Sequence, residues 1–157
     1  MTDQFYFATV AGIALSVAGF AGLVTALRGD GRWSRIELWR LRNIVVSSLI
    51  LTLVALLPVP VYRAVGGDEP LAIRIMSALL VLLFANVIRL SIGERREWPG
   101  YLKNVILTVG FQLLVQLANV FLGSLPLLML GLLGWLSFPI QLFMRVIQDF
   151  RPPTRGD

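Results

Sequence analysis

Three carboxamide side chains lie in a stretch of sequence that is otherwise apolar enough to cross a membrane. Gln112, Gln116 and Asn119 fall within LTVGFQLLVQLANVF, residues 107–121. With about 100° of rotation per helical residue, these three and Thr108 share an arc of about 80° on one helix face. Unpaired amides are costly in hydrocarbon, so this polar face must meet other helices or water.

The next apolar segment carries a second polar strip at the same spacing, which includes Ser137 and Gln141. A turn of only a few residues, GSLP, separates the two segments, so we expect a tight antiparallel hairpin. Its register places Gln112 near Ser137 and Thr108 near Gln141. Hydrogen bonds between the strips, worth about 0.6 kcal/mol each in membranes, are the simpler interpretation. A water-lined path or a polar ligand pocket is the alternative.

Residue types that carry out catalysis or bind metals are scarce. The chain has no cysteine and no histidine, which removes thiolate nucleophiles and the commonest general base and metal ligand. The sequence has no Gly-rich phosphate-binding loop followed by lysine, and no paired intramembrane carboxylates that suit proton-coupled transport. We therefore expect no enzymatic activity, no cofactor and no metal site.

Arg89 is a charged side chain well inside an apolar segment, close to Asn86 and about one turn from the segment's end. The simpler interpretation is that the guanidinium extends to the membrane interface. The alternatives are an ion pair with Glu94, Glu97 or Glu37, or the binding of a lipid phosphate.

The composition indicates that these polar residues belong to a membrane protein. The 157-residue chain is 57% hydrophobic, with a mean hydropathy of +0.78, whereas soluble domains are about 45–50% apolar. We expect an all-α integral membrane bundle of five transmembrane helices, in one domain over residues 1–150 with a disordered cytoplasmic tail at 151–157. Five apolar segments are each near the length that spans a bilayer: 5–27, 40–62, 71–92, 103–122 and 125–147.

The net charge of +5 fits a membrane protein better than a nucleic-acid-binding one. Most of the 14 lysine and arginine residues lie in the first loop, the third loop and the C-terminal region, which an odd number of spans puts on one side. Because cytoplasmic loops are rich in basic residues, we expect the N-terminus outside and the C-terminus in the cytoplasm. The expected partner is the lipid bilayer, with no nucleic acid.

The sequence also predicts where two helices begin and which face of the first segment packs. Ser34 and Glu37 have the spacing of a capping box, and Asp68 precedes Pro70 as a helix N-cap should. The first segment carries small residues that would let another helix approach closely, either within the chain, which is the simpler interpretation, or from a second copy. These residues recur at every fourth position: Ala14, Ala18, Gly22 and Ala26.

The first third of the chain, with GFAGLVTALRG followed by ELWRLRNIV, resembles small bacterial membrane proteins of unknown function. The resemblance implies a bacterial cytoplasmic membrane and no particular activity. We expect a non-enzymatic integral membrane module that acts through helix–helix association, as a homo-oligomer or with a protein partner. The alternative is a small oligomeric channel or transporter with a polar path lined by the fourth segment.

Overall fold

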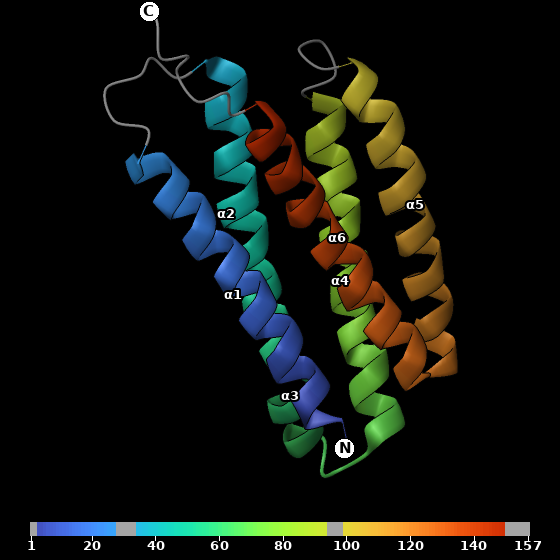
Figure 1. The fold of residues 1–157 in the computed structure, drawn as a ribbon. Helices are drawn as coiled ribbons and strands as arrows, with labels where there is room; N and C mark the ends of the chain where they lie inside the picture. Colours follow the sequence, from blue (N-terminus) through green and yellow to red (C-terminus); the bar gives the residue numbers. More distant parts are fainter. Residues whose placement is uncertain (1–2, 28–33, 94–98, 150–157) are drawn as a thin grey trace, which may run out of the picture.

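The computed structural model describes residues 3–27, 34–93 and 99–149. All the secondary structure within these ranges is helical, so the expected all-α bundle is confirmed (Figure 1). The predicted tail at 151–157 lies outside the described residues. The helices are α1 (Gln4–Leu27), α2 (Arg35–Leu56), α3 (Pro58–Ala64), α4 (Glu69–Gly93), α5 (Pro99–Leu122) and α6 (Leu125–Asp149).

The long helices have the length and surface of membrane-spanning elements. Among the described residues, four stretches are long and apolar enough to cross a bilayer: α1, α2 together with α3, α4 and α6. The apolar part of α5 that could be assessed, Ile106–Leu122, is shorter. Large apolar side chains such as Leu53, Leu82 and Phe121 are 67%, 69% and 74% exposed. A surface of this kind suits lipid rather than water.

The predicted helix caps of α2 and α4 are present. The Ser34 backbone N–H donates to Glu37 Oε2 at 2.8 Å, and the Glu37 N–H donates to Ser34 Oγ at 3.2 Å, which completes the capping box. Asp68 Oδ1 accepts from the Leu71 N–H at 3.0 Å at the start of α4. These side chains satisfy backbone donors that a helix leaves unpaired at its N-terminus.

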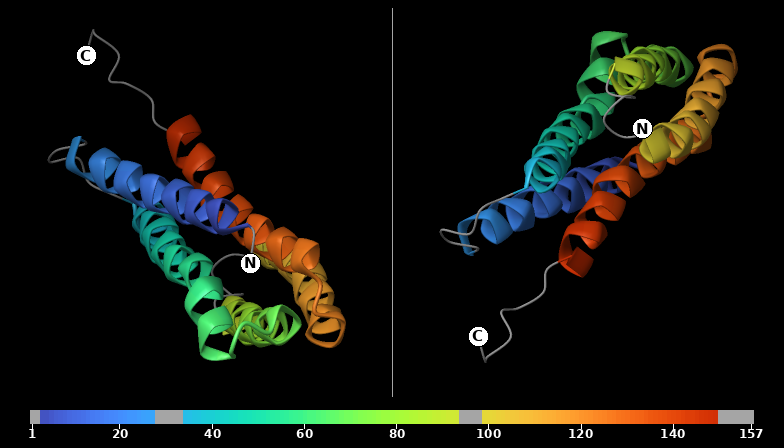
Figure 2. Two further views of the ribbon diagram at one scale, coloured as in Figure 1. Left: turned by 90° about the horizontal axis from the view of Figure 1, so that it is seen from below. Right: turned by 90° about the horizontal axis from the view of Figure 1, so that it is seen from above.

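The helices pack in pairs, with α6 in contact with both. The most extensive contacts join α1 to α2 and α4 to α5, and α6 packs mainly on α2 with further contacts to α1, α4 and α5. Figures 1 and 2 show α6 running obliquely between the pairs. The predicted hairpin of α5 and α6 is present, with a two-residue turn at Gly123 and Ser124. The two helices diverge above Gly123 and Ser124 because α5 packs on α4 whereas α6 packs on α2.

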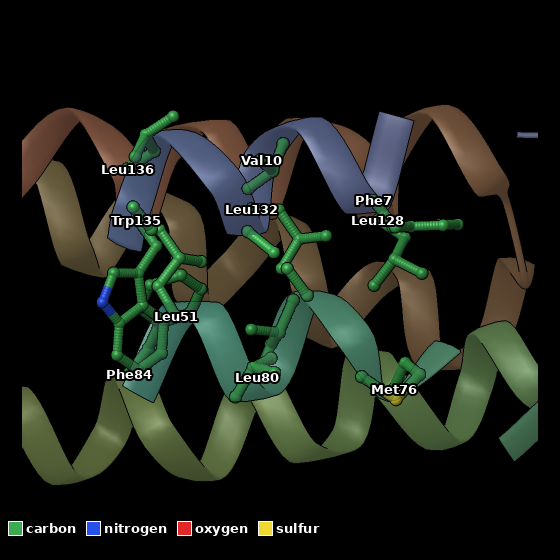
Figure 3. Packing of buried hydrophobic residues seen from close by; sticks show 14 of the residues in the cluster. Phe7, Val10, Leu51, Met76, Leu80, Phe84, Leu128, Leu132, Trp135 and Leu136 are labelled. Carbon is green, nitrogen blue, oxygen red and sulfur yellow. The ribbon is translucent and has the colours of Figure 1, made fainter. Parts of the chain in front are cut away.

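The hydrophobic core draws one face from each of α1, α2, α4 and α6. Figure 3 shows the α6 side chains lying between those of α1, α2 and α4. The Tyr6 hydroxyl adds a polar contact between α1 and α6, donating to the Met129 carbonyl at 2.7 Å. This core fixes the path of α6 and thereby the position of its polar face. Its labelled members are Phe7, Val10, Leu51, Met76, Leu80, Phe84, Leu128, Leu132, Trp135 and Leu136.

The small-residue face predicted for α1 is only half right. Ala14 and Ala18 are buried, but Gly22 and Ala26 are exposed, and a Cβ at Gly22 would meet nothing within 4 Å. The cause is helical drift, because steps of four residues rotate the face by about 40° each, and three steps add about 120°. A seven-residue step rotates it by only about 20°, so Ala21 stays in line with Ala14 and is buried.

Candidate functional site

The amides of α5 fall into two groups according to their burial. Gln116 and Asn119 have no exposed surface, whereas Gln112 is half-buried. All three project from the side of α5 that faces α4 and α6, as the polar spacing predicts. The two groups are bonded differently, and the difference decides what each can do.

Asn119 joins three parts of the chain. Its Nδ2 donates to Ser77 Oγ on α4 at 2.8 Å, and its Oδ1 accepts from the Ser124 N–H at 2.8 Å. Its backbone carbonyl accepts from the Gly123 N–H at 2.8 Å. Gly123 has φ +63°, and a Cβ there would lie 3.2 Å from the Pro70 carbonyl oxygen of α4. The side chain therefore holds the α5–α6 turn in shape and fastens it to α4.

Gln116 joins α5 to α6 one turn away. Its Nε2 donates to the Leu127 carbonyl at 2.6 Å. The amide lies directly against Gly131, where an added Cβ would come within 2.7 Å of Gln116 Cδ. Its Oε1 is buried and has no hydrogen-bond partner among the described residues. The glycine makes room for the amide, and the helices are in close contact here.

Gln112, one turn nearer the start of α5, also lies against a glycine of α6, but it makes no hydrogen bond like that of Gln116 to Leu127. Its amide lies against Gly134, where an added Cβ would come within 2.9 Å of Gln112 Oε1. That oxygen is buried and has no partner in the part of the chain that the structure describes. The Gln112 amide therefore lies as close to α6 as the Gln116 amide does, but it borders a cavity.

A cavity of about 210 Å³ lies between α4, α5 and α6 at this point. None of its lining residues is charged. Thr108, Phe111, Ser137 and Gln141 are exposed, so the cavity opens on the outer surface of the bundle. On its inner side Trp135 lies beside Phe84, with ring centroids 5.2 Å apart (Figure 3). The lining consists of Phe84, Val87, Thr108, Val109, Phe111, Gln112, Gly134, Trp135, Ser137, Phe138 and Gln141.

The predicted register between the two polar strips is close, but the predicted hydrogen bonds are not all present. Gln112 and Ser137 line the same cavity, yet Ser137 Oγ donates to the Gly134 carbonyl of its own helix at 2.7 Å. Thr108 and Gln141 likewise meet at the cavity and are exposed. Near the turn Gln116 bonds to α6 through the Leu127 backbone carbonyl, which is not part of the second polar strip.

Two hydrogen-bond partners of the α5 amides were not predicted from the sequence. Ser77 bonds to Asn119 from α4, and the Leu127 partner of Gln116 is a backbone carbonyl, which every residue possesses. The antiparallel register also predicts that Gln116 lies near Gly131 and Gly134, where the backbones can approach, and the structure places Gln116 against Gly131 and Gln112 against Gly134.

Asn86 and Arg89 take no part in this site. Both are exposed on the last turns of α4. Arg89 makes no ion pair with any described residue, and Glu94 and Glu97, two of the suggested partners, lie outside the described ranges. That the exposed guanidinium extends to the membrane interface stays a prediction.

No group of three or more acidic residues that could hold a metal ion occurs within the described ranges. Comparison of the chain with protein-family models, with curated proteins and with solved structures gives no match. Function must therefore be inferred from the arrangement of the polar residues.

Proposed function

We propose that this protein is a non-enzymatic membrane interaction module that acts through helix–helix association, with a second copy or with a partner protein. The observation that carries the proposal is that Gln116 and Asn119, the two fully buried amides, bond to α6, to the turn and to α4. Their polar groups are used to join helices within an apolar bundle. The location we propose is a bacterial cytoplasmic membrane with the N-terminus outside.

The same observation argues against the alternative of a channel or transporter along α5. A conducting path would need polar groups in contact with water over the length of the strip. The cavity beside Gln112 does not include Gln116 or Asn119, which have no exposed surface. The polar strip therefore changes from an open cavity to closed helix contacts within about one turn.

Reconstituted flux tests the choice between these two functions. We expect liposomes containing the native protein to show no flux of K⁺, Cl⁻ or protons above that of empty liposomes. A conducting path predicts robust flux that Gln112→Leu abolishes by dewetting and Gln112→Glu retunes through its charge. That result would show that the protein is a channel.

Cross-linking tests association itself. The native chain has no cysteine, so single cysteines can be placed on exposed positions of different helices, such as Gly19, Leu53, Leu82 and Phe121. Oxidation or a short bifunctional thiol reagent is then applied in native membranes. We expect one helix face to give dimers, or adducts to a partner protein, far more strongly than the others. If no position cross-links above the background of the cysteine-free chain, the association function is wrong.

A further inference from the structure

We infer that the cavity between α4, α5 and α6 is a binding site for an uncharged, membrane-dissolved amphiphile that carries a hydroxyl group. The inference is independent of helix association, since the cavity lies within one chain. It concerns the part of the polar strip that does not join helices. The ligand class follows from the position, charge and bonding of the lining residues.

The position of the cavity sets the route of entry. Gln112 is ten residues from the end of α5 at Leu122, about 15 Å along the axis at about 1.5 Å per residue. A membrane-spanning helix of this length places that level in the hydrocarbon region. The exposed lining residues Phe111 and Gln141 open the cavity sideways, so a ligand enters from the bilayer.

The lining selects an uncharged ligand. No lining residue ionises, and an unpaired charge in hydrocarbon is costly. The aromatic rings of Phe84, Trp135 and Phe138 offer an apolar inner surface. An engineered cavity of about 150 Å³ can hold a benzene-sized molecule. A cavity of about 210 Å³ therefore accommodates a ring or a short head group, while a longer tail remains in lipid.

The unpaired oxygen of Gln112 specifies a hydrogen-bond donor. Buried polar atoms are almost always paired, and an unpaired one calls for a partner. Gln112 Oε1 is buried, lacks a partner among the described residues and belongs to a side chain that lines the cavity. Ser137 donates to Gly134, which leaves its oxygen lone pairs available at the same site. A hydroxyl group can donate to Gln112 and accept from Gln141.

This hydroxyl chemistry has two natural sources in a membrane, a ring alcohol of the phenol or hydroquinone type and a long-chain aliphatic alcohol. Photolabelling of the native protein in lipid nanodiscs distinguishes them. The probe is 4-decylphenol with a diazirine in its alkyl chain, and the adducts are mapped by mass spectrometry. The competitors are unlabelled 4-decylphenol, 1-hexadecanol and the methyl ether of each, which cannot donate a hydrogen bond.

We expect adducts on the lining residues of α4, α5 and α6, displaced by a hydroxyl compound at about tenfold lower concentration than by its ether. The stronger of the two hydroxyl competitors identifies the source. Ser137→Phe should fill the cavity from an exposed position and lower the labelling at least about tenfold. Leu114→Phe, which adds a ring to an exposed position of α5 outside the cavity, should leave it unchanged.

Two further variants isolate the Gln112 oxygen. Gln112→Leu should bring the hydroxyl-to-ether ratio close to one. Gln116→Leu removes an amide one turn away that does not line the cavity, and should preserve the ratio. Equal competition by alcohols and ethers against the native protein would overturn the assignment. So would labelling spread evenly over exposed α5 residues and insensitive to Ser137→Phe. Both outcomes are independent of the cross-linking that tests association.

Discussion

A single added charge at Gln116 tests whether the amides of α5 lie in a dry, paired contact between helices. Gln116→Glu keeps the shape of the side chain but replaces the Nε2 donor with oxygen. The Leu127 carbonyl that accepts from Nε2 at 2.6 Å would then face a carboxylate. The second carboxylate oxygen would take the place of Gln116 Oε1, which has no hydrogen-bond partner among the described residues, so nothing there would stabilise a negative charge. The glutamate must therefore take up a proton, whose O–H can donate to the same carbonyl.

The free energy needed to protonate the introduced glutamate sets how much stability the variant loses at pH 7. An unperturbed glutamate has a pKa of about 4.3, so protonating it at pH 7 costs about 3.7 kcal/mol at about 1.4 kcal/mol per pH unit. Burial raises the folded-state pKa above the unfolded value. The free energy of unfolding is therefore close to that of the native protein below about pH 4.3, and it falls as pH rises until the folded-state pKa is reached.

Unfolding in mixed detergent micelles between pH 4 and pH 8, measured for variant and native protein together, gives this difference directly. Gln116→Leu should lower stability by an amount that does not change with pH, because it adds no titrating group. Gln148→Glu, an exposed position at the end of α6, should show almost no pH-dependent loss. If Gln116→Glu is as stable as native protein at pH 7.5, water reaches this amide and the dry-contact interpretation is wrong.

Three further predictions concern topology and packing. A cysteine at Asp3 should react with an impermeant thiol reagent applied to intact cells, and one at Gly156 should react only after lysis; the reverse pattern would invert the orientation. Ala14→Leu should lower stability by about 1–3 kcal/mol through overpacking, whereas Gly22→Leu should cost less than about 0.5 kcal/mol in a detergent-stability assay. Gly131→Ala should also lower stability by about 1–3 kcal/mol, because its Cβ would overlap the Gln116 amide; unchanged stability would contradict that close contact.

The local features of the fold could be predicted because each depends on residues close together in the sequence. The capping box of Ser34 and Glu37 lies within four residues, and the turn at Gly123 and Ser124 joins neighbouring segments. The inward position of the α5 amides followed from the cost of exposing them to lipid. These inferences needed only helical periodicity and the apolar nature of the surroundings.

The arrangement of whole helices could not be predicted in the same way. Hydropathy shows that α5 and α6 are apolar, but many helix pairings bury comparable apolar surface in lipid. The choice of α2 as the main partner of α6 depends on side-chain fit, seen in how Leu132 and Trp135 meet the core. The divergence of α5 and α6 follows from that choice. Gln112 and Ser137, which the antiparallel register pairs, line the same cavity, but Ser137 donates to its own helix instead.

The carboxamides of α5 thus have two roles: one group bonds to neighbouring elements, and the other borders the cavity. Gln116 over Gly131 and Gln112 over Gly134 are equivalent pairs one turn apart. Near the turn, where Asn119 holds α5 close to α6 and α4, the Gln116 amide reaches a backbone carbonyl. One turn further, the Gln112 amide lies against Gly134 just as closely but borders a cavity, and its buried Oε1, like that of Gln116, has no partner among the described residues. The cavity beside Gln112 thus lies where α5, held against α4, and α6, held against α2, leave space between them.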